Sequence, residues 1–390
     1  MIQDYDERRL GRTPFGAVKE QDGVLVRLHH GTHVTIEHAD AVTGDLKALV
    51  ERQQSIAAER IEPVEWRVHQ HFATRELAGH LVEAGFTEDE PAHVMIMGRD
   101  RALATDALPE SVSAVLGKAE FDEARLATPA TRQVWEDEAG VVTWYALRRD
   151  QELTGLLWWH AAPSDKFIEF GMTGAHEEFG PLPQRVAPNW PFHQRHLLVE
   201  ATREVRDLVA RQGFHELTAI RTFRWAPKGE RHVTRPIRPV GEVEYEDLLD
   251  RFGQRFAFNA DMHHFPGITE PADSITWSNV LDAAEDVAPA IRRALKACVK
   301  PGELIFFADP YHLGSAADLH RVDGPGQPRW RASPIPDGDY AVLAPYDLRF
   351  GTFGHPWEDS LCVWGEELLA EVSDELDALM PRLRTGGKKK

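Results

Sequence analysis

Residues 210–219 read ARQGFHELTA, and this short stretch is the most informative guide to the fold. Gly213 stands where a helix would end with a left-handed residue, and the run ELTAIR at 216–221 then has the composition of a strand. The pattern predicts a long helix before Gly213 and a strand after it. The apolar stripe of that helix is expected to consist of Leu198, Ala201, Val205 and Leu208.

Upstream of the predicted helix, three strand-like runs follow one another along the chain. They lie at residues 141–147, 153–160 and 167–173. The helix itself is expected to begin after an N-cap at Asn189, with Pro191 tolerated in its first turn. Strands in series, followed by a helix and a further strand, are typical of an α/β layer arrangement. We therefore expect an α/β (α+β) fold with a mixed sheet.

The chain is expected to contain two folded parts. Residues 226–242 are rich in Pro, Gly and Arg and are the best candidate for a linker. The expected divisions are an N-terminal α/β segment at 1–100, a core at 117–225, the linker at 226–242, a separate α/β domain at 243–383 and a basic tail at 384–390. The end of the chain, RLRTGGKKK, is expected to be frayed and exposed.

Composition and charge exclude several classes of partner. The 390 residues carry a formal net charge of −19, whereas general nucleic-acid binding and docking on an anionic membrane both need a basic surface. No apolar run approaches the roughly 18 residues of a membrane span. Two cysteines, Cys298 and Cys362, suit a reducing cytoplasm, which is the expected location. An unknown protein or a small amine remains as the expected partner.

The order of elements resembles the GCN5-related N-acetyltransferase (GNAT) family over about residues 15–222. The resemblance is to two-part bacterial members, in which a small α/β segment precedes the core. It implies acyl transfer from acetyl-CoA to a primary amine, with a Gly-rich loop for the pyrophosphate, a carboxylate base near the fourth strand and commonly a tyrosine as the acid. The segments that carry the resemblance are DGVLVRLHHGTHVTIEHADA (22–41), VEWRVHQHFATRELAGHLVEAGFTEDEPAHVMIMG (64–98), LTGLLWWHA (153–161), FIEFGMTGA (167–175) and ATREVRDLVARQGFHELTAI (201–220).

The predicted cofactor loop departs from what this resemblance implies. Between His176 and Leu198 there are one glycine and four prolines, and each proline removes a backbone N–H that would otherwise bind phosphate. The candidates for residual cofactor binding are Arg185, His193 and Arg195. The alternative is that they only solvate an exposed loop. We therefore expect no cofactor, with acetyl-CoA as the ligand if the chain is an enzyme.

The resemblance also implies a base, for which Glu169 is the candidate. By strand alternation Ile168 and Phe170 face one layer and Glu169 the other, where it is either a pocket-facing catalytic base or a solvent-facing carboxylate. No tyrosine occurs between Tyr145 and Tyr245, so the implied acid is missing. The sequence favours a degenerate, non-catalytic protein (a pseudoenzyme) that acts as a binding or scaffold module. The alternative is an acyl-CoA-dependent N-acetyltransferase.

The 19 histidines raise the question of a metal site. The densest group is HHGTH at 29–33, where Gly31 and Thr32 are typical of a hairpin turn. Neither an HExxH motif nor a paired Cys/His arrangement is present. The sequence therefore predicts scattered histidines and no metal.

The C-terminal part resembles a bacterial domain family known only as a domain of unknown function, over about residues 245–383. The segments that carry this resemblance are FPGITEPADSITW (265–277), PDGDYAVLA (336–344) and DLRFGTFGHPWEDSLCVWGEELL (347–369). The resemblance implies a related fold and no activity.

Polar groups set among aromatic residues and glycines in this last segment predict a small-ligand site. The candidates are Asp347, Arg349, His355, Trp357 and Glu358, and Asp309 and His312 are expected to join them. In the alternative interpretation Arg349 is structural, because it can pair with Asp347 or Glu358 and stack on Trp357. Binding of a small polar or cationic ligand by this domain is the second alternative function.

Overall fold

The structure is a computed structural model, and it describes residues 1–72, 75–98, 111–114, 142–160, 166–173, 177–179, 196–229, 232–309 and 312–389. The chain divides into two compact units, Met1–Val233 (unit 1) and Thr234–Lys390 (unit 2). Each unit combines helices with a large sheet, so the predicted α/β fold class is confirmed. Among the described residues, no helix has both the length and the apolar character to cross a lipid bilayer.

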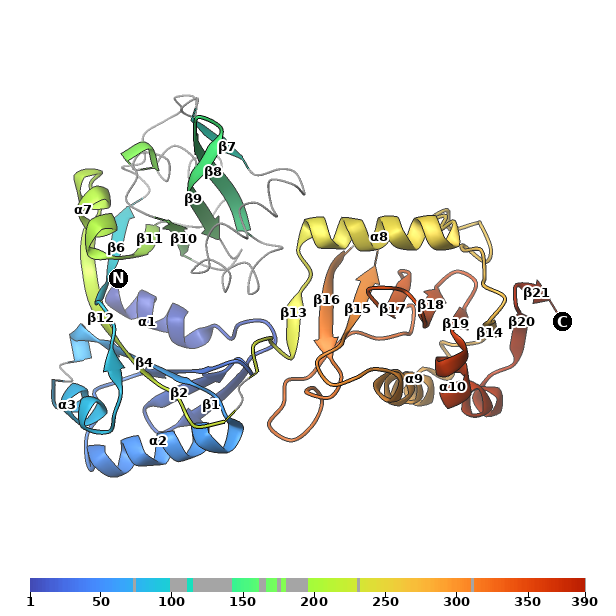
Figure 1. The fold of residues 1–390 in the computed structure, drawn as a ribbon, viewed down its shortest axis with the longest axis horizontal. Coiled ribbons are helices and arrows are strands. Elements are labelled where there is room, and N and C mark those ends of the chain that lie inside the picture. The colour runs from blue at the N-terminus through green and yellow to red at the C-terminus, as the bar shows by residue number, and fades with distance from the viewer. Residues whose placement is uncertain are drawn as a thin grey trace. The chain divides into compact units, whose positions relative to one another are not determined.

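Unit 1 is built on a single twelve-stranded sheet (Figure 1). Its described helices are α1 (Ile2–Gly11), α2 (Leu46–Arg60), α3 (Arg75–Glu83) and α7 (Arg203–Arg211), with short 3-10 turns at Gln70–Phe72 and Glu177–Phe179. Its strands are β1 (Val18–Asp22), β2 (Leu25–His29), β3 (Val34–His38), β4 (Val64–His69), β5 (Thr87–Glu88), β6 (Ala92–Gly98), β7 (Val112–Ala114), β8 (Val142–Arg149), β9 (Glu152–His160), β10 (Phe167–Met172), β11 (His196–Ala201) and β12 (His215–Trp225).

The sheet order joins strands from early and late in unit 1. The order is β1-β2-β3-β4-β12-β6-β11-β10-β9-β8-β7, with β5 paired to β12. Strand β12, eleven residues long, lies between β4 and β6 and is antiparallel to both. The pairs β3·β4 and β10·β11 are parallel. Strand β12 comes after β11 in the chain but pairs with β4. The strands before residue 99 and the described strands of unit 1 after residue 141 therefore belong to one sheet.

The two faces of this sheet carry different helices. Buried side chains of α2 and α3 pack with Trp66 and Phe223, and Val205 and Val209 of α7 pack with alternate residues of β6 and β11. Tyr5 of α1 packs with the intervening residues of β6, β10, β11 and β12. Successive residues of a strand point to opposite faces. Helix α1 therefore covers one face, and α2, α3 and α7 cover the other (Figure 1).

The long helix predicted from Asn189 to Gly213 is wrong for residues 196–201, and residues 189–195 lie outside the described part of the structure. Leu198 and Ala201 lie in β11, and the helix begins at Arg203, after an extended N-cap at Thr202 whose Oγ accepts from the Val205 N–H (3.5 Å). Strand β11 lies between β6 and β10 and is buried on both faces, so its apolar residues are consecutive and do not alternate. In the sequence, such a run followed closely by an amphipathic helix has the same pattern of apolar residues as a single longer helix.

Unit 2 is a second layered structure with a nine-stranded antiparallel sheet. Its strands are β13 (Ile237–Pro239), β14 (Ser274–Ser278), β15 (Leu304–Asp309), β16 (His312–Asp318), β17 (Ala341–Pro345), β18 (Gly351–His355), β19 (Ser360–Trp364), β20 (Arg382–Thr385) and β21 (Lys388–Lys389), in the order β13-β16-β15-β17-β18-β19-β14-β20-β21. Its helices are α8 (Glu242–Phe256), α9 (Ala284–Cys298) and α10 (Glu366–Leu379). Helices α9 and α10 pack on one face and α8 on the other (Figure 1).

The expectation of a frayed C-terminal end is wrong for residues 382–389. Strand β20 pairs with β14, with Thr385 opposite Ile275 and Arg384 opposite Thr276. Arg384 is only 4% exposed. Its charge suggested a solvent-facing position, but the carboxylates of Glu270 and Glu358, distant in sequence, bind it inside the unit.

Candidate functional site

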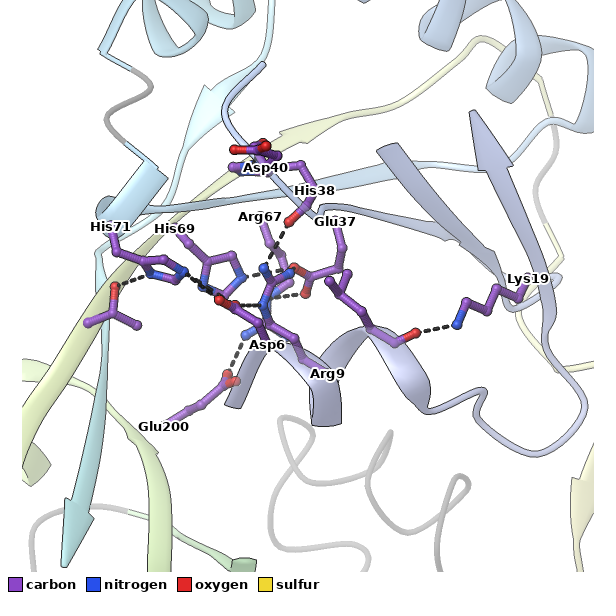
Figure 2. A network of polar contacts seen from close by, with 12 residues as sticks. Asp6, Arg9, Lys19, Glu37, His38, Asp40, Arg67, His69, His71 and Glu200 are labelled. Atoms are coloured by element: carbon purple, nitrogen blue, oxygen red, sulfur yellow. Dashed lines mark hydrogen bonds and ion pairs between the residues drawn. The ribbon is translucent and has the colours of Figure 1, made fainter. Parts of the chain in front are cut away.

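Helix α1 has few apolar residues and makes many polar contacts with the sheet (Figure 2). Its sequence is IQDYDERRLG, and Tyr5, 1% exposed, is its buried residue. The Tyr5 ring packs with Val94, Ile96 and Ile220. Burial raises the pKa of Tyr5 well above its ordinary value, so its hydroxyl stays protonated. The charged residues on either side of Tyr5 reach the surrounding strands.

A carboxylate on β3, Glu37, lies at the centre of the contacts beneath α1 (Figure 2). Arg9 of α1 donates from Nη1 to Glu37 Oε2 (2.8 Å), and His69 Nε2 lies 2.8 Å from the same oxygen. Arg67 Nε lies 3.5 Å from Glu37 Oε1. Arg9 also donates from Nη2 to the main-chain carbonyl of His38 (2.8 Å). One guanidinium therefore joins α1 to both a side chain and the main chain of β3.

The cations around Glu37 outweigh the cost of burying it. Burial alone raises the pKa of a carboxyl group, but attraction to Arg67, the hydrogen bond from His69 and attraction to Arg9 lower the pKa of Glu37 to about 2. Glu200 of β11 accepts from Arg67 Nη2 at 2.5 Å. Burial lowers the pKa of Arg67, yet attraction to Glu200 and Glu37 raises it well above its ordinary value. Glu37 and Arg67 are therefore both ionised at neutral pH.

A second set of contacts extends the network to β12. Asp6 of α1 accepts from Arg9 Nε (2.7 Å) and lies 3.2 Å from His71 Nε2. His71 Nδ1 lies 2.9 Å from Thr218 Oγ1. Burial is the main cause of a lowered pKa at His71, so a neutral imidazole that donates to Asp6 fits these contacts. Through Arg9 and Asp6, α1 is joined to β3 and, by way of His71, to β12.

Polar contacts also fasten the two ends of α1. Asp4 is bound by Lys166, which precedes β10, and by the N-terminal amine at 3.1 Å. The hydrogen bond from Lys166 is the main cause of the lowered pKa of Asp4, about 2. At the other end, Lys19 of β1 donates to the main-chain carbonyl of Leu10, close to the C-terminus of the helix (Figure 2).

The predicted base, Glu169, lies on the α1 face of β10. Ile168 and Phe170 are each 2% exposed and pack on the α7 face, so the predicted alternation is confirmed. The Glu169 carboxylate is ion-paired with Arg8, and Arg12 Nη1 lies 3.8 Å from Glu169 Oε2. Both guanidiniums therefore contact the same carboxylate oxygen of Glu169. In this arrangement Glu169 holds α1 on the sheet.

The predicted cofactor-binding residues Arg185, His193 and Arg195 lie outside the described residues. In the sequence they fall between β10 and β11. These two strands are described, and they pair in parallel with Glu169 opposite Leu198. Cofactor binding by these three residues stays a prediction.

In unit 2 the five predicted ligand-binding residues fall into two groups. Arg349 Nη1 lies 3.0 Å from Asp347 Oδ2, and Arg349 also pairs with Glu303 (2.5 Å) and Glu367 (3.3 Å) at the surface. This contact with Asp347 agrees with the structural interpretation of Arg349, but the expected stacking on Trp357 is wrong, because the guanidinium lies over the Phe350 ring, 4.7 Å from its centroid. The second group is His355, Trp357 and Glu358, which lie at the β18–β19 connection.

The second group is organised by a residue that the sequence did not single out, Arg384. Its Nη1 and Nη2 each lie 2.6 Å from an oxygen of Glu358, and its Nε lies 2.8 Å from Glu270 Oε1. His355 Nδ1 accepts from the Glu358 N–H (3.2 Å), and its Nε2 lies 3.3 Å from the carbonyl oxygen of His264. Burial lowers the pKa of His355, in keeping with a neutral ring. A ligand role for the five predicted residues stays a prediction.

The two residues expected to join them lie on the β15–β16 hairpin, which β17 separates from β18 and β19 in the sheet. Asp309, 7% exposed, is the last residue of β15 and lies opposite His312, the first residue of β16. The side chain of His312 lies outside the described part of the structure. Among the described residues, no group of three or more His, Cys, Asp or Glu side chains is placed to hold a metal ion. In the HHGTH segment, His29 Nδ1 lies 2.5 Å from Glu62 Oε2, and the rings of His30 and His33 stack.

The network between α1 and the sheet has only part of its signal in the sequence. The strands β3 and β4 alternate, and the residues that point away from the α2 side include Glu37, Arg67 and His69. Three ionisable residues on adjacent strands of one face form a recognisable pattern. Their partners Asp6 and Arg9 come from a separate helix, which leaves no local signal.

Comparison with known proteins finds both resemblances. Unit 1 is similar to solved structures that include a GCN5-related N-acetyltransferase from Kribbella flavida, at 18% sequence identity and a TM-score of 0.40, covering 58% of this chain and 95% of that one. A tandem GNAT protein from the clavulanic acid biosynthesis pathway matches at 14% sequence identity and a TM-score of 0.38. The match covers 58% of this chain and 88% of that one. A functionally unknown conserved protein from Staphylococcus epidermidis ATCC 12228 matches at 10% sequence identity and a TM-score of 0.42. The match covers 54% of this chain and 95% of that one.

The C-terminal resemblance is found in unit 2. Residues 239–369 match the family described as a protein of unknown function, DUF2716. An uncharacterized protein of Bacillus subtilis (strain 168), YxiI, is 26% identical over 101 residues, which are 25% of this chain. The match spans 61% of the length of that relative. The chain is thus similar to GNAT structures over part of its length, and residues 239–369 match a domain family of unknown function.

Proposed function

We propose that unit 1 is an acetyltransferase-like binding module that does not transfer acyl groups. The observation that supports this proposal is the ion pair between Glu169 and Arg8, with Arg12 as a second cation. A general base must reach the proton that it removes and must have a lone pair free to accept it. The first requirement conflicts with a carboxylate whose Oε2 is held by two cations of α1 and the residue after it, on the face where the base would act.

Acetyl-CoA is the cofactor that the GNAT resemblance implies. Of the residues predicted to act with it, the structure describes Glu169, and the bound carboxylate does not fit the role of a base. The proposed partner is a basic protein or a small amine, because a chain with a net charge of −19 attracts cations.

The test is calorimetric titration of the full chain with acetyl-CoA, together with an assay for CoA release in the presence of a primary amine. The variant is Arg8→Gln/Arg12→Gln, which frees Glu169 from both guanidiniums. Arg206→Gln is the matched control, because Arg206 pairs with Asp207 on α7, on the opposite face of the sheet. Melting temperatures establish that each protein is folded.

We expect no acyl transfer by the wild-type chain, the control or the double variant. Turnover by the wild-type chain, or its micromolar binding of acetyl-CoA, would overturn the proposal. Turnover by the double variant alone would also overturn it, since the site would then be a competent enzyme that α1 holds inactive.

A further inference from the structure

Unit 2 contains a cavity that lies apart from the residues discussed above. It has a volume of about 470 Å³ and lies between α9 and residues 319–327, which follow β16. This volume is within the range of small-molecule sites. Leu319 and Val322 line it and belong to the hydrophobic core, so part of its wall is apolar.

The polar lining of the cavity is cationic, although the chain as a whole is acidic. Arg292, Arg293 and Lys296 contribute three positive charges and Asp323 one negative charge, which leaves a surplus of two positive charges when His320 is neutral. Arg292 and Lys296 are four residues apart on α9 and therefore lie on one side of it. A cavity of one sign concentrates ligands of the opposite sign.

Arg292 fixes the shape of the cavity. It donates from Nη1 to Asp323 Oδ2 (2.6 Å) and to the Trp330 carbonyl (2.8 Å), and from Nη2 to the Ala332 carbonyl (2.5 Å). Asp323 Oδ1 in turn accepts from the Trp330 N–H (3.1 Å). These bonds attach the loop after β16 to α9 before any ligand arrives. Preorganisation of this kind lowers the cost of binding.

Three other groups remain to meet a ligand. Arg293 pairs with Glu375, but the two side chains are 63% and 47% exposed, and such a pair is weak in water. Lys296 is exposed and has no ion-pair partner among the residues that the structure describes. Gln327 Oε1 accepts from the Gly324 N–H (3.1 Å), so its amide nitrogen is the part that can donate elsewhere.

We propose that this cavity binds a small organic anion, a phosphate monoester or a carboxylate, whose apolar part rests on Leu319 and Val322. Lys296 and Arg293 bind the charged oxygens, and Gln327 donates a further hydrogen bond. Arg292 is a positioning residue, because three of its five N–H donors are already used by the loop. The site lies in unit 2 and does not depend on the function proposed for unit 1.

The test is calorimetric titration of the full chain with phenyl phosphate and with benzoate at low ionic strength. The informative variant is Lys296→Gln, and Lys300→Gln is the matched control, because Lys300 follows α9 and does not line the cavity. We expect saturable binding to the wild-type chain and to the control. Binding to Lys296→Gln should be weaker by about tenfold or more, as expected for the loss of one charge-assisted hydrogen bond. Equal melting temperatures exclude misfolding as the cause.

The comparison between ligands identifies the chemistry. The tighter of phenyl phosphate and benzoate identifies the anionic group, and weaker binding of inorganic phosphate supports the role of the apolar wall. Absence of saturable binding by both aromatic anions would overturn the proposal. Equal weakening by Lys300→Gln, or equal binding of benzylamine, would do the same, because each would show that the lining charges do not select the ligand.

Discussion

Arg9 of α1 and Glu37 of β3 form a 2.8 Å ion pair in which the two side chains are only 7% and 5% exposed. A surface pair contributes little to stability, but a buried charge that loses a partner keeps its desolvation cost. Arg67 and His69 remain to compensate Glu37 when Arg9 is removed. The pair is therefore expected to matter most for the attachment of α1.

Substitution Arg9→Ala should destabilise unit 1 by about 2–4 kcal/mol, below the full cost of an uncompensated buried charge because two partners remain. The measurement is hydrogen exchange of α1 and β3 peptides as urea rises. Arg52→Ala is the control: Arg52 also pairs with a carboxylate, Asp22, but its side chain is 53% exposed, so the change should stay within about 1 kcal/mol. Equal effects of the two substitutions would contradict a special role for burial.

Stability should fall in acid because of His38, which is fully buried and whose pKa burial lowers to about 4. The folded state favours the neutral ring, whereas the unfolded chain binds a proton near pH 6.5. The free energy of unfolding should therefore decrease as the pH falls from about 6.5 to about 4, by up to about 3 kcal/mol. Glu37 extends the loss of stability to lower pH. The stabilising charge of its carboxylate disappears as the pH falls from about 4.5 to about 2.

The measurement for His38 is urea unfolding at several pH values between these limits. The variant His38→Gln cannot titrate and should show a flatter dependence on pH. His80→Gln is the control, since the side chain of His80 is 38% exposed. An unchanged slope in His38→Gln would show that other groups cause the acid sensitivity.

Glycines in β18 permit close packing, and Gly351→Ala tests this. A Cβ at Gly351 would lie 2.5 Å from the Leu343 carbonyl oxygen and 2.6 Å from the Trp364 ring. Overpacking of this kind costs about 1–3 kcal/mol, measurable by thermal unfolding. Gly253→Ala in α8 is the matched control, because nothing lies within 4 Å of its Cβ position, and it should stabilise the helix by about 0.5–1 kcal/mol. The two substitutions should change the free energy of unfolding in opposite directions. A Gly351→Ala variant of unchanged stability would contradict the packing argument.

The parts of the fold that were predictable have a local cause. Gly213, at φ 95°, follows the last turn of α7 as expected, because a left-handed residue there needs no side chain. The face of Glu169 followed from the alternation of a strand with one apolar side. The sequence around Leu198 predicts a helix, whereas the structure has a strand there. Because β11 is buried on both faces at this point, the period of apolar residues that distinguishes a strand from a helix is lost.

The parts of the site that were not predictable depend on distant partners. Arg8 and Glu169 are 161 residues apart, and Arg384 and Glu270 are 114 apart. A charged residue has the same local pattern whether it faces water or a buried partner. The sequence therefore placed Glu169 correctly on its strand and gave no sign of the guanidinium that binds it.

The buried contacts of Arg384 provide the sharpest test of unit 2. The Arg384 and Glu270 side chains are 5% and 1% exposed, so Arg384→Met leaves Glu270 and Glu358 without their cation and should destabilise unit 2 by about 3–5 kcal/mol. Arg382→Met is the matched control two residues away on β20, where the pair with Asp377 is 28% and 35% exposed and should contribute less than about 1 kcal/mol.

The double variant Arg384→Met/Glu270→Gln separates the two causes of this loss. If the penalty arises from uncompensated carboxylates, neutralising Glu270 should recover part of the stability, which gives a coupling energy of about 1–3 kcal/mol in a double-mutant cycle followed by urea unfolding. If instead Arg384 contributes only by packing its aliphatic stem, the two substitutions should be additive. Additivity would therefore remove the ion pair from the account of how β20 is held in the sheet.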